Sequence, residues 1–341
     1  MTISLRRCLT AAVLAGSLLA GTVGCNTFSS SGRDEYKMSA GDSGSGAGSR
    51  TSAAPALPYD VRPLLQPKNK YLGLAADGAP ESMKPVEKFA SDAGKKPNVI
   101  EFYSAWGDQY ETKLVRNAWE YGAVPFIAWE PMKKSLADIS SGREDGYIRA
   151  YARSVRETNL PVALSFAHEM NGHWYPWGTK NATPQQFVEA YKHVHDVFQQ
   201  EGATQVIWVW SPNVINPMPT VRLQPYWPGD NYVDWVGVVG YYGKAGPATY
   251  ETLYGPTMTE IRRFTQKPFL IAETAAESGT RKSADIADLF QGTLKRDDVI
   301  GFIWFDFDKE ADWRITSTPE AARSFRKQAE NPRFGFDVKK P

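Results

Sequence analysis

Cysteine and histidine are scarce in this 341-residue sequence, which contains two cysteines and four histidines and has a formal net charge of +1. So few thiol and imidazole groups provide little for a disulfide framework or a zinc site. The balanced charge supplies no basic surface for nucleic acid and no strong field to steer an ionic substrate. We therefore expect no cofactor, no metal ion and no nucleic-acid partner.

The apolar run near the N-terminus, residues 11–20, is too short for a typical membrane-spanning helix of about 20 apolar residues. It follows Arg6 and Arg7 and precedes small residues and Cys25. A positively charged start followed by a short apolar segment is typical of a secretory signal. We predict that residues 1–25 form a secretion or lipoprotein-type signal.

Residues 22–25, TVGC, resemble a bacterial lipoprotein cleavage site, in which the cysteine carries lipid, although an apolar residue is usual where Thr22 stands. Lipidation of Cys25 is the prediction, and plain secretion is the alternative. Cys8 lies inside the predicted signal, so the processed chain has no second thiol for a disulfide. We expect an extracytoplasmic monomer, secreted or lipid-anchored at the outer face of a bacterial cell membrane.

Residues 26–66 contain few large apolar side chains and include the Ser/Gly-rich run GDSGSGAGS at 41–49. Such a segment buries too little surface to offset the entropy lost on ordering. We predict a flexible linker over residues 26–66 and a catalytic domain over residues 67–335.

Apolar runs of strand length recur from residue 70 onward, with segments of helical spacing between them, such as 146–158, 184–201 and 284–294. Several runs are apolar at nearly every position, as in strands buried on both faces. The predicted strands are 71–75, 98–103, 124–129, 162–167, 205–210, 235–240, 269–272 and 299–305. Eight strand–helix units predict an α/β fold, a (β/α)₈ TIM barrel. The alternative, a doubly wound open sheet, prefers a Gly-rich phosphate turn after its first strand, which residues 73–80, GLAADGAP, do not provide.

Two glutamates lie at the ends of strand-like runs. Glu169 closes the fourth run and Glu273 closes the seventh. Active sites of such barrels form at the C-terminal ends of the strands, and strands 4 and 7 lie across that rim from one another. A pair of carboxyl groups flanking a sugar is what cleavage of a glycosidic bond requires.

Three motifs resemble glycoside hydrolase family 26, a barrel family with catalytic acids on strands 4 and 7. They are HEMNGHW at 168–174, WPGDNYVDWVG at 227–237, and WFD at 304–306 followed by DWR at 312–314. The resemblance runs from about residue 66 to 330. It implies an endo-acting hydrolase of β-linked polysaccharide, such as β-1,4-mannan or mixed-linkage β-1,3-1,4-glucan. Strand 3 ends in AWEP at 128–131, without the histidine found near the site in mannanases, and in this respect looks more like the glucanase members.

Spacing alone does not say which glutamate is the acid, and the resemblance implies the assignment. It makes Glu169 the general acid/base and Glu273 the nucleophile of a retaining double displacement. For Glu169 a structural ion pair at the rim is the alternative. Glu277 is the rival for the nucleophile, but it lies further into the loop and is expected to be a solvated charge.

The predicted substrate-binding residues surround this pair. His168 either contacts the sugar 2-hydroxyl or is a packed, hydrogen-bonded histidine. Tyr241 is predicted to hydrogen-bond the nucleophile, with Tyr242 as competitor because successive strand residues face opposite ways. The predicted sugar platforms are Trp174, Trp304 and Trp129, with Trp177 as a further candidate, and core packing is the alternative for each.

Competing functions are judged from the same residues. A zinc protease is rejected because the HExxH pattern is absent and His168 and His173 are five positions apart. A surface lipoprotein that binds glycan without cutting it often lacks an acid, whereas both are present here. A transglycosylase acting on the organism's own polysaccharide uses the same two glutamates, and only its products distinguish it.

Overall fold

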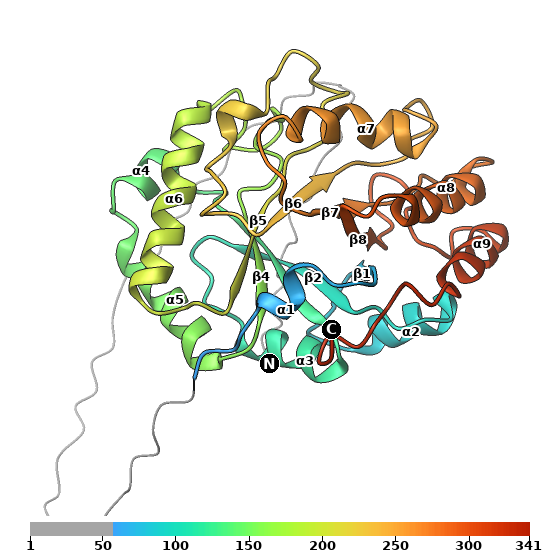
Figure 1. The fold of residues 1–341 in the computed structure, drawn as a ribbon, viewed down its shortest axis with the longest axis horizontal. Coiled ribbons are helices and arrows are strands. Elements are labelled where there is room, and N and C mark those ends of the chain that lie inside the picture. The colour runs from blue at the N-terminus through green and yellow to red at the C-terminus, as the bar shows by residue number, and fades with distance from the viewer. Residues whose placement is uncertain (1–56) are drawn as a thin grey trace, which may run out of the picture. The chain divides into compact units, whose positions relative to one another are not determined.

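The computed structural model describes residues 57–341, whose centre is a closed barrel of eight parallel strands in sequential order (Figure 1). The strands are β1 Tyr71–Ala75, β2 Val99–Ala105, β3 Val124–Glu130, β4 Val162–Phe166, β5 Val206–Trp210, β6 Trp235–Val239, β7 Phe269–Thr274 and β8 Val299–Phe305. The predicted TIM barrel is confirmed, and both ends of every predicted strand agree to within about two residues, the usual uncertainty of element ends. The predicted signal, Cys25 and residues 26–56 of the predicted linker lie outside the described residues.

The helices surround the barrel and cover the outer faces of the strands (Figure 1). They are α1 Arg62–Leu65, α2 Lys84–Ala93, α3 Thr112–Tyr121, α4 Leu136–Ser140, α5 Asp145–Thr158, α6 Pro184–Gln200, α7 Tyr250–Ile261, α8 Lys282–Lys295 and α9 Pro319–Ala329, with a 3₁₀ turn at Gln224–Tyr226. Within residues 57–341 no helix combines the length and apolarity needed to cross a membrane.

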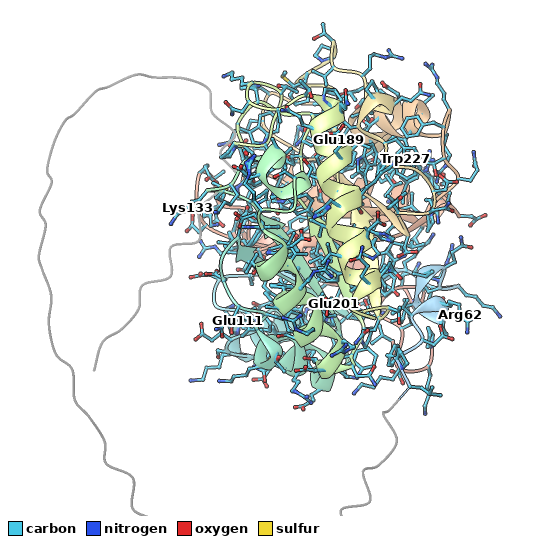
Figure 2. All side chains as sticks on the ribbon, turned by 90° about the vertical axis from the view of Figure 1, so that its left-hand side faces the viewer. Arg62, Glu111, Lys133, Glu189, Glu201 and Trp227 are labelled. Carbon is cyan, nitrogen blue, oxygen red and sulfur yellow. The ribbon has the colours of Figure 1, made fainter. Side chains whose placement is uncertain are left out.

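Local sequence explains where α5 and α6 begin and end. The Gln186 backbone N–H donates a hydrogen bond to the Thr183 hydroxyl at 3.2 Å, and the Thr183 backbone N–H donates one to the Gln186 side-chain oxygen at 2.9 Å. Pro184 occupies the first turn of α6. Asn159 ends α5 in the left-handed conformation that asparagine tolerates. Figure 2 shows the two helices on one flank of the barrel, with Glu201 labelled at the end of α6. Arg149 of α5 forms an ion pair with Glu201 at 3.0 Å.

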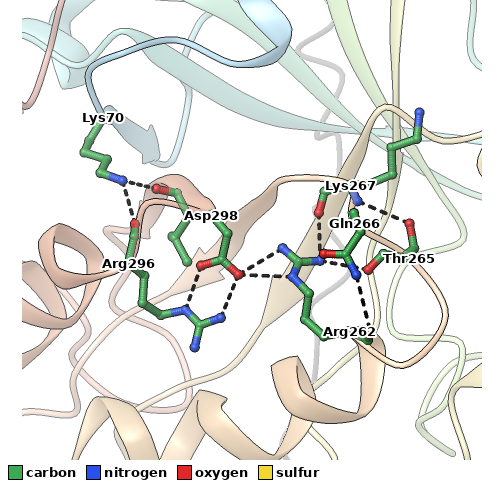
Figure 3. A network of polar contacts seen from close by, with 8 residues as sticks. Lys70, Arg262, Thr265, Gln266, Lys267, Arg296 and Asp298 are labelled. Atoms are coloured by element: carbon green, nitrogen blue, oxygen red, sulfur yellow. Dashed lines mark hydrogen bonds and ion pairs between the residues drawn. The ribbon is translucent and has the colours of Figure 1, made fainter.

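Polar side chains tie together the N-terminal end of the barrel (Figure 3). The Lys70 ammonium group, just before β1, donates to the Arg296 carbonyl at 2.8 Å. Asp298, just before β8, accepts from Arg296 at 2.8 Å and from Arg262 at 3.1 Å. The Arg262 guanidinium also lies 3.7 Å from the ring centroid of Phe269 at the start of β7. This end of the barrel is therefore held by structural contacts.

The folded part of the chain extends beyond the predicted boundaries of 67 and 335. Leu64 in α1 is fully buried, and its carbonyl accepts a hydrogen bond from the Tyr71 hydroxyl at 2.8 Å. At the other end, the Phe336 ring lies 4.9 Å from the Tyr71 ring, and Val338 is fully buried. These few apolar side chains pack against the barrel, and composition averaged over a long Ser/Gly-rich segment concealed the N-terminal ones.

Candidate active site

The C-terminal ends of the strands bring polar and aromatic side chains to one rim. Parallel strands in a closed barrel all end at the same edge, so residues far apart in sequence converge there. The residues at or just beyond the strand ends are Tyr103, Glu130, His168, Glu169, Asn213, Tyr241, Glu273 and Phe305.

Glu169 lies three residues beyond the end of β4 and has a left-handed backbone, with φ of 55°. Its N–H donates to the Ser211 carbonyl at 2.6 Å, which fixes the turn. Its carboxyl group accepts from the Trp174 indole N–H at 2.9 Å and from the Asn213 amide. A non-glycine residue in this region of backbone space is strained, and such strain occurs mostly at functional sites.

The HEMNG motif supports Glu169 through neighbouring residues. The Asn171 side-chain amide forms two hydrogen bonds of 2.9 Å with the backbone of Asn213, donating to its carbonyl and accepting from its N–H. These bonds fix Asn213, whose own side-chain amide donates to Glu169. Gly172 is required because a Cβ atom there would lie 2.4 Å from the Trp174 ring. The motif therefore positions both groups that donate hydrogen bonds to the Glu169 carboxyl group, the Trp174 indole and the Asn213 amide.

Glu273 is held from two other strands. The hydroxyl groups of Tyr103 on β2 and Tyr241 at the end of β6 both donate to its carboxyl group. Tyr241 takes the predicted position, whereas the competing Tyr242 points outward and donates to Asp288 at 3.1 Å. Glu277 pairs with Lys244 at 3.0 Å in the loop, away from this cluster.

Burial and mutual repulsion shift the pKa values at the rim. Glu169 and Glu273 are 3% and 4% exposed. Burial, followed by the charge of Glu273, raises the pKa of Glu169 to about 7. Burial also raises the pKa of Glu273, while the two tyrosine hydroxyls and then the nearby Lys309 oppose the rise. Both carboxyl groups therefore bind a proton more tightly than an exposed glutamate, and the two phenols partly offset this for Glu273.

Two further carboxyl groups share this space. Burial is the main cause that raises the pKa of Glu101 on β2 well above its usual range and that of Glu130 on β3 to about 8. The charge of Glu273 adds to both shifts. Among residues 57–341 no group of three or more His, Cys, Asp or Glu side chains is arranged to hold a metal ion.

His168 is buried within an aromatic shell beside Glu169. Its Nε2 atom lies 3.0 Å from the Tyr175 hydroxyl, and its ring lies 5.8 Å from the Trp177 ring. Burial lowers the pKa of His168 to about 4, so the imidazole is neutral at neutral pH. Nε2 thus has the contact expected of a packed histidine, while the buried Nδ1 atom has no partner in the described part of the chain.

Trp129 and Trp304, predicted as sugar platforms, are both 0% exposed and belong to the outer packing layer. Trp129 stacks between Trp106 and Tyr151, at 4.6 and 4.3 Å between ring centroids. Trp304 packs against Phe325 of α9 at 5.2 Å. The predictions for these two tryptophans are wrong because strand side chains alternate, and the adjacent inward positions belong to Glu130 and Phe305.

Trp177, the further platform candidate, is also buried and donates to the His168 carbonyl at 2.6 Å. Trp174 differs, because it is only partly buried and contacts Glu169 directly. Of the four candidate tryptophans, Trp174 is therefore the one that a substrate could contact.

Sequence reasoning missed several residues at the rim. They are Tyr103, Asn213, Glu101, Glu130 and the aromatic residues Phe305 and Trp313, whose rings lie 5.8 and 5.0 Å from the Tyr241 ring. A polar side chain at the C-terminal end of a predicted strand was an available signal for Glu130 and Asn213. The hydrogen bond of Tyr103 to a residue on β7 had no local signal.

Comparisons with known proteins place the chain in a family. The sequence model of Glycosyl hydrolase family 26 matches residues 143–321, a segment that contains Glu169 and Glu273. Endoglucanase H of Acetivibrio thermocellus is 28% identical over 263 residues, which cover 73% of this chain and 29% of that protein. Mannan endo-1,4-beta-mannosidase A and B of Caldalkalibacillus mannanilyticus is 28% identical over 201 residues, 56% of this chain and 35% of that protein. The chain thus spans about a third of the length of these curated relatives.

Among solved structures, the catalytic domain of the GH26 endo-beta-1,4-mannanase of Bacillus sp. JAMB-750 superposes with a TM-score of 0.64 at 17% identity, covering 81% of this chain and 90% of that one. At this identity the superposition supports the fold alone. The family match spans more than half of the chain and includes both strand-end glutamates. On the strength of that match, the chain belongs to glycosyl hydrolase family 26.

Proposed function

We propose that this protein is an endo-acting, retaining glycoside hydrolase that cleaves internal β-linkages of a polysaccharide, either β-1,4-mannan or mixed-linkage β-1,3-1,4-glucan. Family membership and the names of the relatives support the reaction class. The observation that carries the mechanism is the contrast between the two carboxyl groups. Both are buried and both accept two hydrogen bonds. Glu169 accepts them from an indole and an amide and has a pKa raised to about 7, whereas Glu273 accepts them from two phenols.

In the first step, protonated Glu169 donates its proton to the leaving glycosidic oxygen while the Glu273 carboxylate attacks the anomeric carbon. Tyr103 and Tyr241 orient the attacking carboxylate and favour its ionised form. The Asn213 and Trp174 donors hold the Glu169 carboxyl group in position.

The second step follows from the electrostatic coupling of the pair. Bond formation removes the negative charge of Glu273, and that charge is one cause of the raised pKa of Glu169. The pKa of Glu169 then falls, so its carboxylate accepts a proton from the water that attacks the intermediate. Hydrolysis releases Glu273 and restores the first arrangement, with retention at the anomeric carbon.

The stereochemical course tests this proposal. Proton NMR of the first products from a β-linked oligosaccharide should show the β-anomer before mutarotation, and an initial α-anomer would exclude double displacement. Glu273→Ala should abolish turnover, and added azide should restore part of it as an α-glycosyl azide. Normal activity in Glu273→Ala would remove Glu273 from the mechanism.

The substrate is identified by a panel of polysaccharides. Galactomannan, barley β-glucan, β-1,3-xylan and cellulose are incubated with the protein, and the products are separated by size. Internal cleavage yields a ladder of oligosaccharides early in the reaction. Products longer than a defined oligosaccharide substrate would indicate transglycosylation, and binding without products would indicate a glycan-binding protein.

We also propose an extracytoplasmic location, with Cys25 as the lipid attachment site of an otherwise monomeric protein. The basis is the sequence of residues 1–25. Mass spectrometry of the membrane fraction should find Cys25 as a lipid-modified N-terminal residue. A soluble, unmodified chain cleaved at another position would favour plain secretion.

A further inference from the structure

Glu130 is a third carboxyl group at the rim, and the mechanism above does not use it. It is the last residue of β3, paired in register with Ala105 of β2. Its backbone is well fixed, since its carbonyl accepts from the Trp106 N–H at 2.9 Å and from the Met132 N–H at 2.8 Å. The side chain is 4% exposed and points inward, opposite to Trp129.

The Glu130 carboxyl group has no hydrogen-bond partner among the described residues, in contrast to Glu169 and Glu273. The His168 Nε2 atom lies 3.9 Å from the Glu130 carboxyl group, beyond hydrogen-bond distance, and is already engaged by Tyr175. The side chain is nearly buried, yet neither of its oxygens is among the fully enclosed atoms without a partner, so the carboxyl group keeps a small opening to solvent. A carboxyl group in this position can form a hydrogen bond with a ligand.

The surroundings of Glu130 favour a neutral carboxyl group. Carboxyl groups act on it from β2, from the loop after β4 and from β7, and the cation Lys309 beyond β8 opposes them. The negative neighbours are Glu101, Glu169 and Glu273. Burial followed by the charge of Glu273 raises the pKa of Glu130 to about 8. A neutral carboxyl group both donates and accepts hydrogen bonds, which suits a sugar hydroxyl.

We propose that Glu130 is a substrate-binding residue that hydrogen-bonds a ring hydroxyl of the neutral sugar unit held between Glu169 and Glu273. The inference rests on the proposed function, because it needs a sugar at this rim. It assigns to β3 a role in recognition, while β4 and β7 supply the chemistry. It also predicts poor acceptance of uronic acids, whose carboxylate would meet a cluster of acidic groups.

Three variants test this role. Glu130→Ala should lower kcat/KM by roughly 10- to 100-fold on the best polysaccharide, as expected for a lost hydrogen bond to the substrate. Glu130→Gln retains a donor and an acceptor of similar shape and should lose roughly 10-fold or less. The matched control is Glu310→Gln, which removes an exposed carboxyl group that also acts on Glu273 by its charge. It should stay within about twofold of the wild type, because it lacks the contact.

Thermal unfolding separates recognition from structural support. A substrate-binding carboxyl group that is buried without a partner should leave Tm unchanged or higher when replaced by Gln or Ala. A fall in Tm of several degrees in both variants would assign Glu130 to the framework instead. A kcat/KM of Glu130→Ala within twofold of the wild type would also overturn the proposal.

Binding measured without turnover distinguishes this inference from the proposed function. In a Glu273→Ala background, calorimetry with a cello- or manno-oligosaccharide should show weaker affinity when Glu130→Ala is added. If the wild type binds but cleaves nothing, the proposed function fails and this comparison still decides the role of Glu130. Equal affinity with and without the Glu130 carboxyl group overturns the inference.

Discussion

Tyr103 on β2 donates a hydrogen bond to the carboxyl group of Glu273 on β7, although the two residues are 170 positions apart in the chain. The closed barrel brings these strands to the same rim. Tyr241 donates a second hydrogen bond from the end of β6. The predicted nucleophile is therefore oriented by two phenols whose side chains are partly buried and pack against the core.

Tyr103→Phe removes one of these donors and leaves the ring in place. Because a hydrogen bond to a charged group contributes about 1.5–3 kcal/mol, kcat/KM should fall by roughly 10- to 100-fold. The pKa of Glu273 should rise, so the acidic limb of the pH profile should move to higher pH. Steady-state kinetics on a soluble β-glycan measure both effects.

The matched control for Tyr103→Phe is Tyr191→Phe. Tyr191 is fully buried between helix and barrel, and its hydroxyl group has no partner among the described residues. Its removal should leave kcat/KM unchanged. An equal loss in both variants would mean that phenylalanine disturbs packing rather than the nucleophile.

Asn213→Ala should move the alkaline limb of the pH profile. In the wild type, kcat/KM should fall as pH rises through about 7, because Glu169 loses the proton that it must donate. The Asn213 hydrogen bond favours the ionised form of Glu169, so its removal should raise the pKa of Glu169 further and move this limb to higher pH. The residual kcat/KM of the variant, measured between about pH 5 and about pH 9, shows the position of the alkaline limb. A limb that moves to lower pH would contradict the assignment of Glu169 as the acid.

The cluster of carboxyl groups should make folding stability depend on pH. Burial raises the pKa values of Glu101, Glu130 and Glu169, so the folded state binds protons more tightly than the unfolded state. The resulting stability is fully present below the unfolded pKa of about 4.3 and is lost as pH rises through the folded values, about 7 for Glu169 and about 8 for Glu130. Denaturant unfolding across this range measures the slope.

Glu101→Gln tests the deepest member of this cluster. One of its carboxyl oxygens is buried without a partner among the described residues, so an uncharged isostere removes the cost of ionisation. The variant should be more stable than the wild type at pH 8, by about 1 kcal/mol or more, and nearly equal to it at pH 4.5. A variant that is less stable at both pH values would show that Glu101 supports the barrel as a carboxylate.

Substitution of Trp304 should lower the stability of the fold, whereas substitution of Trp174 should lower activity. Trp304→Ala removes a fully buried ring and should destabilise the fold by about 3–5 kcal/mol. Trp174→Phe keeps an aromatic face but removes the donor to Glu169, so it should lower kcat/KM with little change in Tm. Urea denaturation and kinetics on the same preparations separate the two effects. A large stability loss in Trp174→Phe would place Trp174 in the core instead.

The eight strands and the barrel follow from the sequence because the signals are local. Buried parallel strands are apolar on both faces, and helical spacing separates them, so each run is recognisable by itself. The same reasoning places Glu169 and Glu273 at strand ends, where barrel sites form. The short helix α1 lacks such a signal, since four residues within a polar segment do not change its average composition.

The sequence did not indicate whether each aromatic side chain on a strand points into the barrel or outward to the helices. Trp129 and Glu130 are adjacent, and so are Trp304 and Phe305, and in each pair one side chain points inward and the other outward. A strand that is apolar at every position shows no alternation that would distinguish inward from outward side chains. Contacts with the surrounding helices show that Trp129 and Trp304 point outward.

The sequence by itself therefore determined the class of fold, the two strand-end glutamates and the family motifs, because each depends on residues close together in the chain. The tertiary structure decided which donors hold those glutamates and which extra carboxyl groups share their space. Tyr103, Asn213 and Glu130 reach the site from three different strands or their ends. Their proximity exists only once the barrel has closed, and burial in that closed state is what shifts the pKa values of the carboxyl groups.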